Sequence, residues 1–167
     1  MIIKEILNRR SVREYKTDAV REEDIIEIIK AGQFAPSAKN NRAVEFVVVR
    51  NQKTKNTISE IVGQEFVKVA PVLIIPASDT AKTDFSIQDL AVVSENMFLQ
   101  AVALGLGSVW KNVRPEWEGK VKELLGIPEN YTVINIIPVG LPETKPEPRT
   151  NKDFDGKKIH KEIWQGK

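Results

Sequence analysis

The chain has 167 residues, of which 29% are charged and 41% hydrophobic, which is the balance of a soluble domain with a sizeable core. Its formal net charge of +2 is too small to indicate nucleic acid or an anionic membrane as a partner. The absence of cysteine excludes disulfides, thiolate metal sites and cysteine nucleophiles, and the single histidine, His160, has no second imidazole with which to build a zinc site.

No targeting or membrane-spanning segment is expected. Lys4 and Glu5 interrupt the apolar residues at the N-terminus, which is unlike the core of a signal peptide. No apolar run approaches the roughly 20 residues that span a bilayer. We therefore expect a cytoplasmic protein.

The first part of the chain predicts two helices and a strand. Apolar residues from Ile2 to Leu7 recur at helical spacing and predict a short amphipathic helix that runs directly into Arg9. Acidic residues at positions 22–24 favour the start of a second helix, which is expected to end near Gly32. The β-branched run at 46–49 predicts a buried strand.

The middle of the chain predicts a helix at 53–64 and a second buried strand at 70–75. From Phe85 to Leu104 apolar residues occur on nearly every side, which is typical of a buried central helix. Gly105 is well placed to end that helix, because glycine adopts the left-handed conformation without strain.

The last part predicts a short strand at 108–110, a helix that begins at Pro115 and ends before Gly126, and a strand at 131–139. Beyond it, the residues from Leu141 on are rich in proline and charge and are expected either to wrap a partner or to lie in solvent. This irregular mixture favours an α+β sandwich with helices on a mainly antiparallel or mixed sheet.

Four segments carry groups that suit a planar, phosphorylated ligand. The guanidinium groups and hydroxyl of segment 9–13 match phosphate oxygens, although a solvated basic helix end has the same composition. Loop 35–40 presents short polar groups, as does an ordinary turn. Segment 105–110 permits close backbone approach, although a helix cap explains its glycines equally well. Arg149 is either a further phosphate contact or a surface charge.

The order of these segments resembles that of the nitroreductase family of FMN oxidoreductases. The similar features are Arg-Arg-Ser-Val-Arg after the opening helix, Ala-Pro-Ser-Ala-Lys-Asn, Phe-Val-Val-Val, a long apolar helix before Gly-Leu-Gly-Ser-Val-Trp, and Pro-Val-Gly-Leu-Pro. They span residues 2–149. The resemblance implies one domain over residues 1–167, folded as a three-layer α-β-α sandwich with a central mixed, mainly antiparallel sheet. It also implies that residues 141–167 form an arm around a partner subunit.

The resemblance further implies a set of FMN contacts and no catalytic or metal-binding side chain. The implied phosphate and ribityl contacts are Arg9, Arg10, Ser11 and Arg13, with Arg149 as a further basic contact; the implied ring contacts are Pro36, Ser37 and Asn40, usually from the neighbouring subunit, and the backbone at Ser108, Val109 and Trp110. Where the family often continues with Gln-Pro-Trp after the asparagine, this chain has Asn41-Arg42-Ala43, so Arg42 stands at a position that often contacts the flavin's pyrimidine edge.

The implied activity is electron transfer from NADH or NADPH, through FMN, to a small flat acceptor such as a nitroaromatic or quinone, in ping-pong order. The implied assembly is a homodimer with FMN at the subunit interface. A flavin-binding or sensory homodimer without efficient turnover, and a structural dimer whose arginines bind another anion, remain the alternatives.

Overall fold

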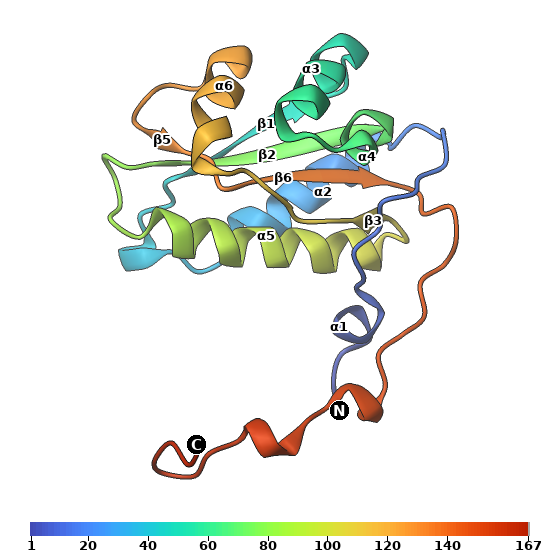
Figure 1. The fold of residues 1–167 in the computed structure, drawn as a ribbon, viewed down its shortest axis with the longest axis vertical. Coiled ribbons are helices and arrows are strands. Elements are labelled where there is room, and N and C mark those ends of the chain that lie inside the picture. Colours follow the sequence, from blue (N-terminus) through green and yellow to red (C-terminus); the bar gives the residue numbers. More distant parts are fainter. Residues whose placement is uncertain (167) are drawn as a thin grey trace.

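The computed structural model describes residues 1–166, which form three layers (Figure 1). A six-stranded sheet lies in the middle. One face is covered by α2 (Glu22–Gln33) and α5 (Ser86–Ala103), and the other by α3 (Gln52–Val62), α4 (Glu65–Val69) and α6 (Pro115–Leu125). The α+β sandwich expected from the sequence is confirmed.

The sheet has the order β1 (Val44–Val49), β2 (Val72–Asp79), β6 (Asn135–Gly140) and β3 (Gly107–Ser108). Two short strands extend it, since β5 (Tyr131–Thr132) pairs with β2 and β4 (Lys111–Asn112) pairs with β6. These strand pairs are all antiparallel. Parallel pairing in the described chain is confined to a bridge between Ser11 and Ser108.

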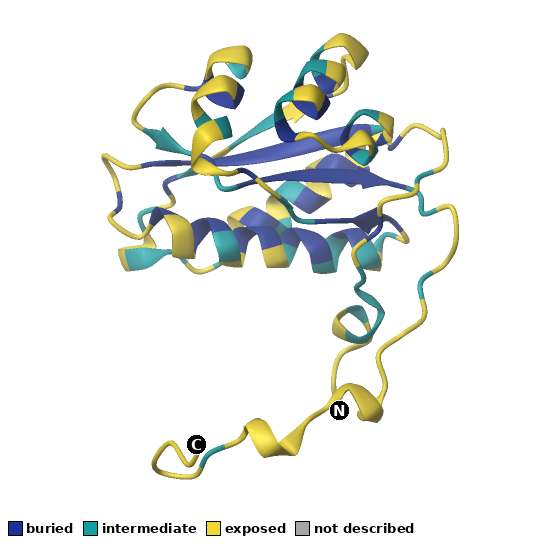
Figure 2. Ribbon diagram, in the orientation of Figure 1, coloured by how far each residue is buried: buried dark blue, intermediate teal, exposed yellow. Residues whose placement is uncertain are grey.

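Strand β2 lies at the centre of the core, and each of its eight residues is buried. Because side chains alternate along a strand, Val72 and Ile74 pack with α2 and α5, whereas Leu73 and Ile75 pack with α3 and α4. Coverage of both faces explains why the run at 70–75 is apolar without alternation. Figure 2 shows β2 and β6 as the buried layer of the molecule.

Strand β1 was expected to be buried, and this is wrong. It lies at the edge of the sheet, where only Val49 is buried and Val48 keeps 39% of its surface exposed. The predicted strand at 131–139 is also divided, into β5 and β6. The predicted helices α2, α3 and α6 are confirmed. Gly126 ends α6 in the left-handed conformation.

Helix α5 is confirmed in extent but only partly in burial. Leu90, Met97 and Ala101 are fully buried against the sheet and α2. In contrast, Ile87 is 63% and Val92 39% exposed. Some apolar residues of α5 therefore pack in the core, whereas others are exposed to solvent in the single chain.

The two ends of the chain lie together outside the sandwich. Helix α1 (Lys4–Asn8) has no buried residue, and the C-terminal segment extends far from the domain (Figure 1). That segment carries two short 3₁₀ turns, η2 (Asn151–Asp153) and η3 (Gly156–Lys158), and is exposed almost throughout (Figure 2). No helix within residues 1–166 combines the length and the apolar character needed to cross a membrane.

Candidate functional site

Two of the four predicted segments meet at the C-terminal end of α5. Ser11 bridges Ser108, and the Val12 N–H donates to the Ser108 carbonyl at 3.0 Å. A Cβ atom on Gly107 would lie 2.7 Å from Val12 Cβ, so glycine is required for this close approach. The chain turns there at Gly105, whose φ of +76° is in the left-handed region. The glycines of segment 105–110 therefore serve both the helix cap and the contact with segment 9–13.

As it leaves the domain, the first part of the C-terminal segment runs beside the N-terminal segment. The Arg149 N–H donates to the Leu7 carbonyl at 2.8 Å, and Arg10 Nε donates to the Glu147 carbonyl at 2.9 Å. The pKa of Asp153 is lowered, chiefly by the Thr150 N–H and further by the charges of Arg149 and Arg10. Arg10 and Arg149, which are distant in sequence, thus lie near one carboxylate.

The arginines of segment 9–13 point in three directions. Arg9 Nε lies 3.8 Å from Glu95 Oε1 on α5, while Arg10 faces the C-terminal segment. Arg13 instead lies over the Phe66 ring of α4, with 5.7 Å from Cζ to the ring centroid. Within residues 1–166 no carboxylate pairs with Arg13, so its N–H donors stay available for an anion. The guanidinium groups do not converge on one point in the single chain.

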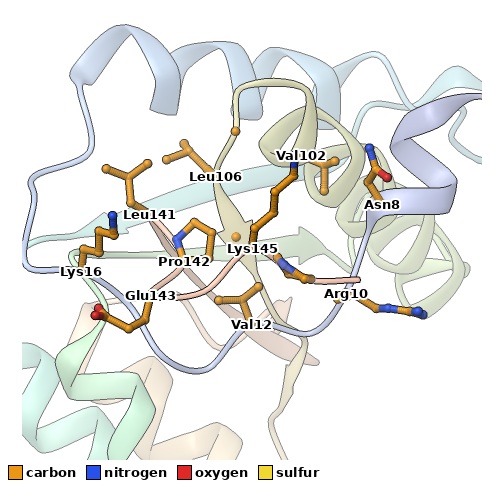
Figure 3. A pocket seen from close by; sticks show the side chains of 13 residues that line it. Asn8, Arg10, Val12, Lys16, Val102, Leu106, Leu141, Pro142, Glu143 and Lys145 are labelled. Atoms are coloured by element: carbon orange, nitrogen blue, oxygen red, sulfur yellow. The ribbon is translucent and has the colours of Figure 1, made fainter. Parts of the chain in front are cut away.

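A cavity of about 420 Å³ lies between this segment, the end of α5 and the start of the C-terminal segment (Figure 3). Its apolar lining includes Val12, Val102 and Leu106. Lys16 and Glu143 lie on one side and Arg10 on the other, with Lys145 between them (Figure 3). The sequence analysis missed Lys16 and Lys145, because no local motif distinguishes them from other surface lysines.

The third predicted segment lies elsewhere. Loop 36–42 is attached to the first turn of α5, where the Ala38 N–H donates to Asp89 Oδ1 at 3.0 Å. Val102, which borders the cavity at the other end, is about 20 Å further along the helix at 1.5 Å per residue. The structure therefore brings segments 9–13, 105–110 and 149 together, and places loop 36–42 at the opposite end of α5.

Loop 36–42 borders a hollow of its own, about 600 Å³ in volume, together with Phe34 and Val93. Arg42 reaches into this region, where its Nε donates to Asn40 Oδ1 at 3.3 Å and its N–H donates to Ser37 Oγ at 3.2 Å. The hollow thus combines an apolar wall with amide, hydroxyl and guanidinium groups, which suits a planar polar heterocycle.

The strand predicted at 108–110 is wrong beyond Ser108, because β3 ends there and Val109 and Trp110 lie between β3 and β4. Val109 is buried, and Trp110 packs edge-on against Phe98 at 6.4 Å between ring centroids. Lys111 Nζ lies 4.5 Å from the centroid of the Trp117 ring. Burial, and then the charge of Arg114, lowers the pKa of Lys111. The side chains of Trp110 and Trp117 therefore serve packing.

The chain is similar in sequence to known nitroreductase-family proteins. The sequence model described as the Nitroreductase family matches residues 6–69 and 62–141. A protein of Methanothermobacter thermautotrophicus, provisionally named NADH dehydrogenase/NAD(P)H nitroreductase, is 38% identical over 170 residues, covering 98% of this chain and 87% of that protein.

Solved structures give the same result. The FMN-dependent nitroreductase of Clostridium difficile R20291 superposes with a TM-score of 0.92 at 34% identity, covering 98% of this chain and 100% of that one. The NADPH:FMN oxidoreductase of Vibrio harveyi, complexed with NAD+, gives a TM-score of 0.86 at 26% identity, covering 97% of this chain and 77% of that one.

Proposed function

Because the chain belongs to the nitroreductase family, it is an FMN-dependent NAD(P)H oxidoreductase, and we propose that two copies of it build each flavin site together. Bound FMN supplies the electron-transfer chemistry between reduced nicotinamide and a second substrate. The polypeptide binds and orients the ring and the phosphate, and needs no acid, base or nucleophile of its own for this.

The observation that carries the shared site is the separation along α5. Segment 9–13 and loop 36–42 both have the groups that suit FMN, yet they lie about 20 Å apart at opposite ends of one helix. A second copy with its α5 antiparallel to the first would bring the loop of one chain to the basic segment of the other. Each site is incomplete without the partner.

The open apolar surface supports the same assembly. Ile87 and Val92 on α5 and Phe34 after α2 are all exposed, and they belong to the layer of the sandwich that has no further cover. The C-terminal segment exposes Phe154 and Trp164 to 71% and 78%. Such groups mark a surface that a partner covers. We propose that residues 141–167 form an arm that packs on the second subunit.

Segment 9–13 and Arg149, which lie near the C-terminal end of α5, fit the phosphate of FMN. Arg13 offers unpaired forked donors, Ser11 adds a hydroxyl, and Arg9 is held only by a loose contact at 3.8 Å to an exposed carboxylate. Arg10 and Arg149 add positive charge from the side of the C-terminal segment. We assign these five residues to the phosphate and ribityl chain, since bidentate guanidinium contacts suit a dianion.

The ring contacts are assigned mainly to loop 36–42, at the N-terminal end of α5. Pro36, Ser37 and Asn40 of the partner would border the isoalloxazine, with the backbone at Ser108, Val109 and Trp110 on its other side. Arg42 stands at the edge of the same hollow and would meet the ring's carbonyl groups. The hollow of about 600 Å³ is open enough for a flat acceptor, and we propose a nitroaromatic or quinone.

Intersubunit complementation tests the shared site. One chain carries Arg13→Ala and the other carries Ser37→Ala with Asn40→Ala, and differently tagged copies allow the mixed dimer to be purified. A shared site predicts that each variant alone binds FMN weakly, while the mixed dimer regains one flavin per two chains. If both halves belonged to one chain, no intact site would form and the mixed dimer would stay colourless.

Anaerobic titration tests the activity. The yellow protein is expected to bleach on addition of NADH or NADPH and to regain its colour with a nitroaromatic or quinone. Bleaching without recovery by any such acceptor would contradict the acceptor class, while leaving the flavin site in place.

A further inference from the structure

We propose that Asp89 is a positioning residue, whose buried carboxylate holds loop 36–42 in the shape that meets the flavin ring of the partner subunit. The inference rests on the proposed function. Helix α5 would then have two roles, since it packs in the domain core and also holds a binding loop in place.

The carboxylate of Asp89 is held by neutral donors. Its side chain is nearly inaccessible, with 4% of the residue exposed. Oδ1 accepts from the Ala38 N–H at 3.0 Å, and Oδ2 accepts from the Thr83 hydroxyl at 3.3 Å. Within residues 1–166 no lysine or arginine pairs with it. The position in the first turn of α5 is favourable for a negative charge.

The donors come from two different loops. Ala38 belongs to the loop after α2, and Thr83 to the turn that leads into α5, where its hydroxyl oxygen also accepts the Phe85 N–H at 3.0 Å. Asp89 therefore joins α5 to both loops at one buried point. A hydrogen bond to a buried charge is stronger than one between neutral groups, so this junction is stiff.

Loop 36–42 needs such a junction because its backbone is strained. Lys39, Asn40 and Arg42 have φ values of 53°, 55° and 51°, in the left-handed region that residues with a side chain rarely occupy. Asparagine tolerates this conformation, whereas lysine and arginine do not favour it. Strained residues persist only where the surrounding structure holds them in place.

The other side-chain hydrogen bonds of this loop are internal. The Arg42 N–H donates to Ser37 Oγ, and the Ala43 N–H donates to Asn41 Oδ1. At its end the loop is joined to β2 through the Asp79 N–H and the Ala43 carbonyl at 3.0 Å. The Asp89 contact therefore anchors the middle of the loop to the domain.

The anchored residues are those that border the proposed ring site. Ser37 precedes Ala38 directly, and Asn40 and Arg42 follow it within the strained stretch. Val93, one turn after Asp89 on α5, borders the same hollow. Helix α5 thus contributes Val93 to the wall of the hollow and, through Asp89, holds the loop that borders it.

The experiment compares Asp89→Ala and Asp89→Asn with the wild type. Hydrogen exchange of residues 36–42 is measured with and without FMN, together with the Kd for FMN and the visible spectrum of the bound flavin. Asp89→Ala leaves the Ala38 N–H without an acceptor, so exchange in the loop should become faster and the Kd for FMN should rise about tenfold or more. Asp89→Asn should lie between, because its amide oxygen still accepts from Ala38.

A control separates positioning from general destabilisation. Asp24→Asn removes another carboxylate of a helix start, where Asp24 pairs with Arg21 at 2.6 Å, and should leave loop exchange and the flavin spectrum as in the wild type. If Asp89→Ala does not fold, Thr83→Val removes one donor while keeping the carboxylate, and should shift both readouts in the same direction by less.

Wild-type loop exchange together with wild-type FMN affinity in Asp89→Ala, or in Thr83→Val where that variant replaces it, would overturn the proposal. A wild-type protein that binds no FMN would instead contradict the proposed function. Loop exchange in the FMN-free protein would still test whether Asp89 holds the loop, so the two failures are distinguishable.

Discussion

The guanidinium carbon of Arg13 lies 5.7 Å from the centroid of the Phe66 ring, so a cation of the N-terminal segment rests on α4 and not on a carboxylate. An aromatic face stabilises the guanidinium cation without using up its N–H donors as a carboxylate would. These donors therefore stay free for an anion. This relationship makes Arg13 the most direct test of the phosphate site.

Arg13→Ala is expected to yield protein with little bound flavin. The loss of one charge-assisted contact to phosphate should cost about 1.5–3 kcal/mol of binding free energy. The measurement is the flavin-to-protein absorbance ratio after purification and the Kd on reconstitution. Arg50→Ala is the control, since Arg50 pairs with Glu22 on the surface at 2.6 Å and lies outside the proposed site. Full flavin content in Arg13→Ala would contradict the phosphate assignment.

Gly107→Ala should destabilise the domain and loosen segment 9–13. The added Cβ would lie 2.7 Å from Val12 Cβ, and relief of this clash requires the two backbones to separate, at about 1–3 kcal/mol. Gly119→Ala in α6 is the matched control, because its Cβ meets nothing within 4 Å and alanine favours a helix by about 0.5–1 kcal/mol. Thermal unfolding should therefore shift in opposite directions, and equal shifts would contradict this account.

Val92→Glu should convert the proposed dimer to a monomer. Val92 is 39% exposed on the open side of α5, where a charge would be buried by the second copy without a partner. Leu124→Glu provides the control, since Leu124 is 37% exposed on α6 in the opposite layer. Sedimentation equilibrium distinguishes the two variants, and a Val92→Glu protein that stays dimeric would exclude this part of α5 from the interface.

Asp79 is expected to make stability depend on pH in the acid range. Its pKa is lowered below 3.8, chiefly by the Ala81 N–H and further by Asn130 and Lys82. A depressed folded-state pKa means that the unfolded chain binds the proton more readily, so the stabilisation is present above about pH 4 and is lost as the pH falls through the folded value. Asp79→Asn should flatten the decrease of Tm between about pH 5 and about pH 3. An unchanged slope would assign the acid sensitivity to other carboxylates.

Much of the helical framework follows from local signals in the sequence. Pro115 and Gly126 mark the two ends of α6, and the acidic residues at 22–24 mark the start of α2. These signals act within one or two turns of backbone, so they do not depend on the rest of the fold. The four segments proposed for the flavin were also recognisable, because their residue types and order do not require a structure.

The sequence did not distinguish the edge strand β1 from the central strand β2, because both are β-branched runs and burial depends on how many neighbours a strand has. It also gave no direction to the guanidinium groups, and did not reveal Lys16 and Lys145 at the cavity.

The sequence by itself determined most of the helices, the absence of thiol chemistry and the residues that suit a phosphate and a ring. Only the tertiary structure decided that loop 36–42 and segment 9–13 lie at opposite ends of α5, and that Asp89 holds the loop there. The physical reason is the range of the forces involved. Helix and turn preferences are set by near neighbours, whereas contacts such as Arg10 with Glu147 join residues far apart in the chain and form only when the whole domain packs.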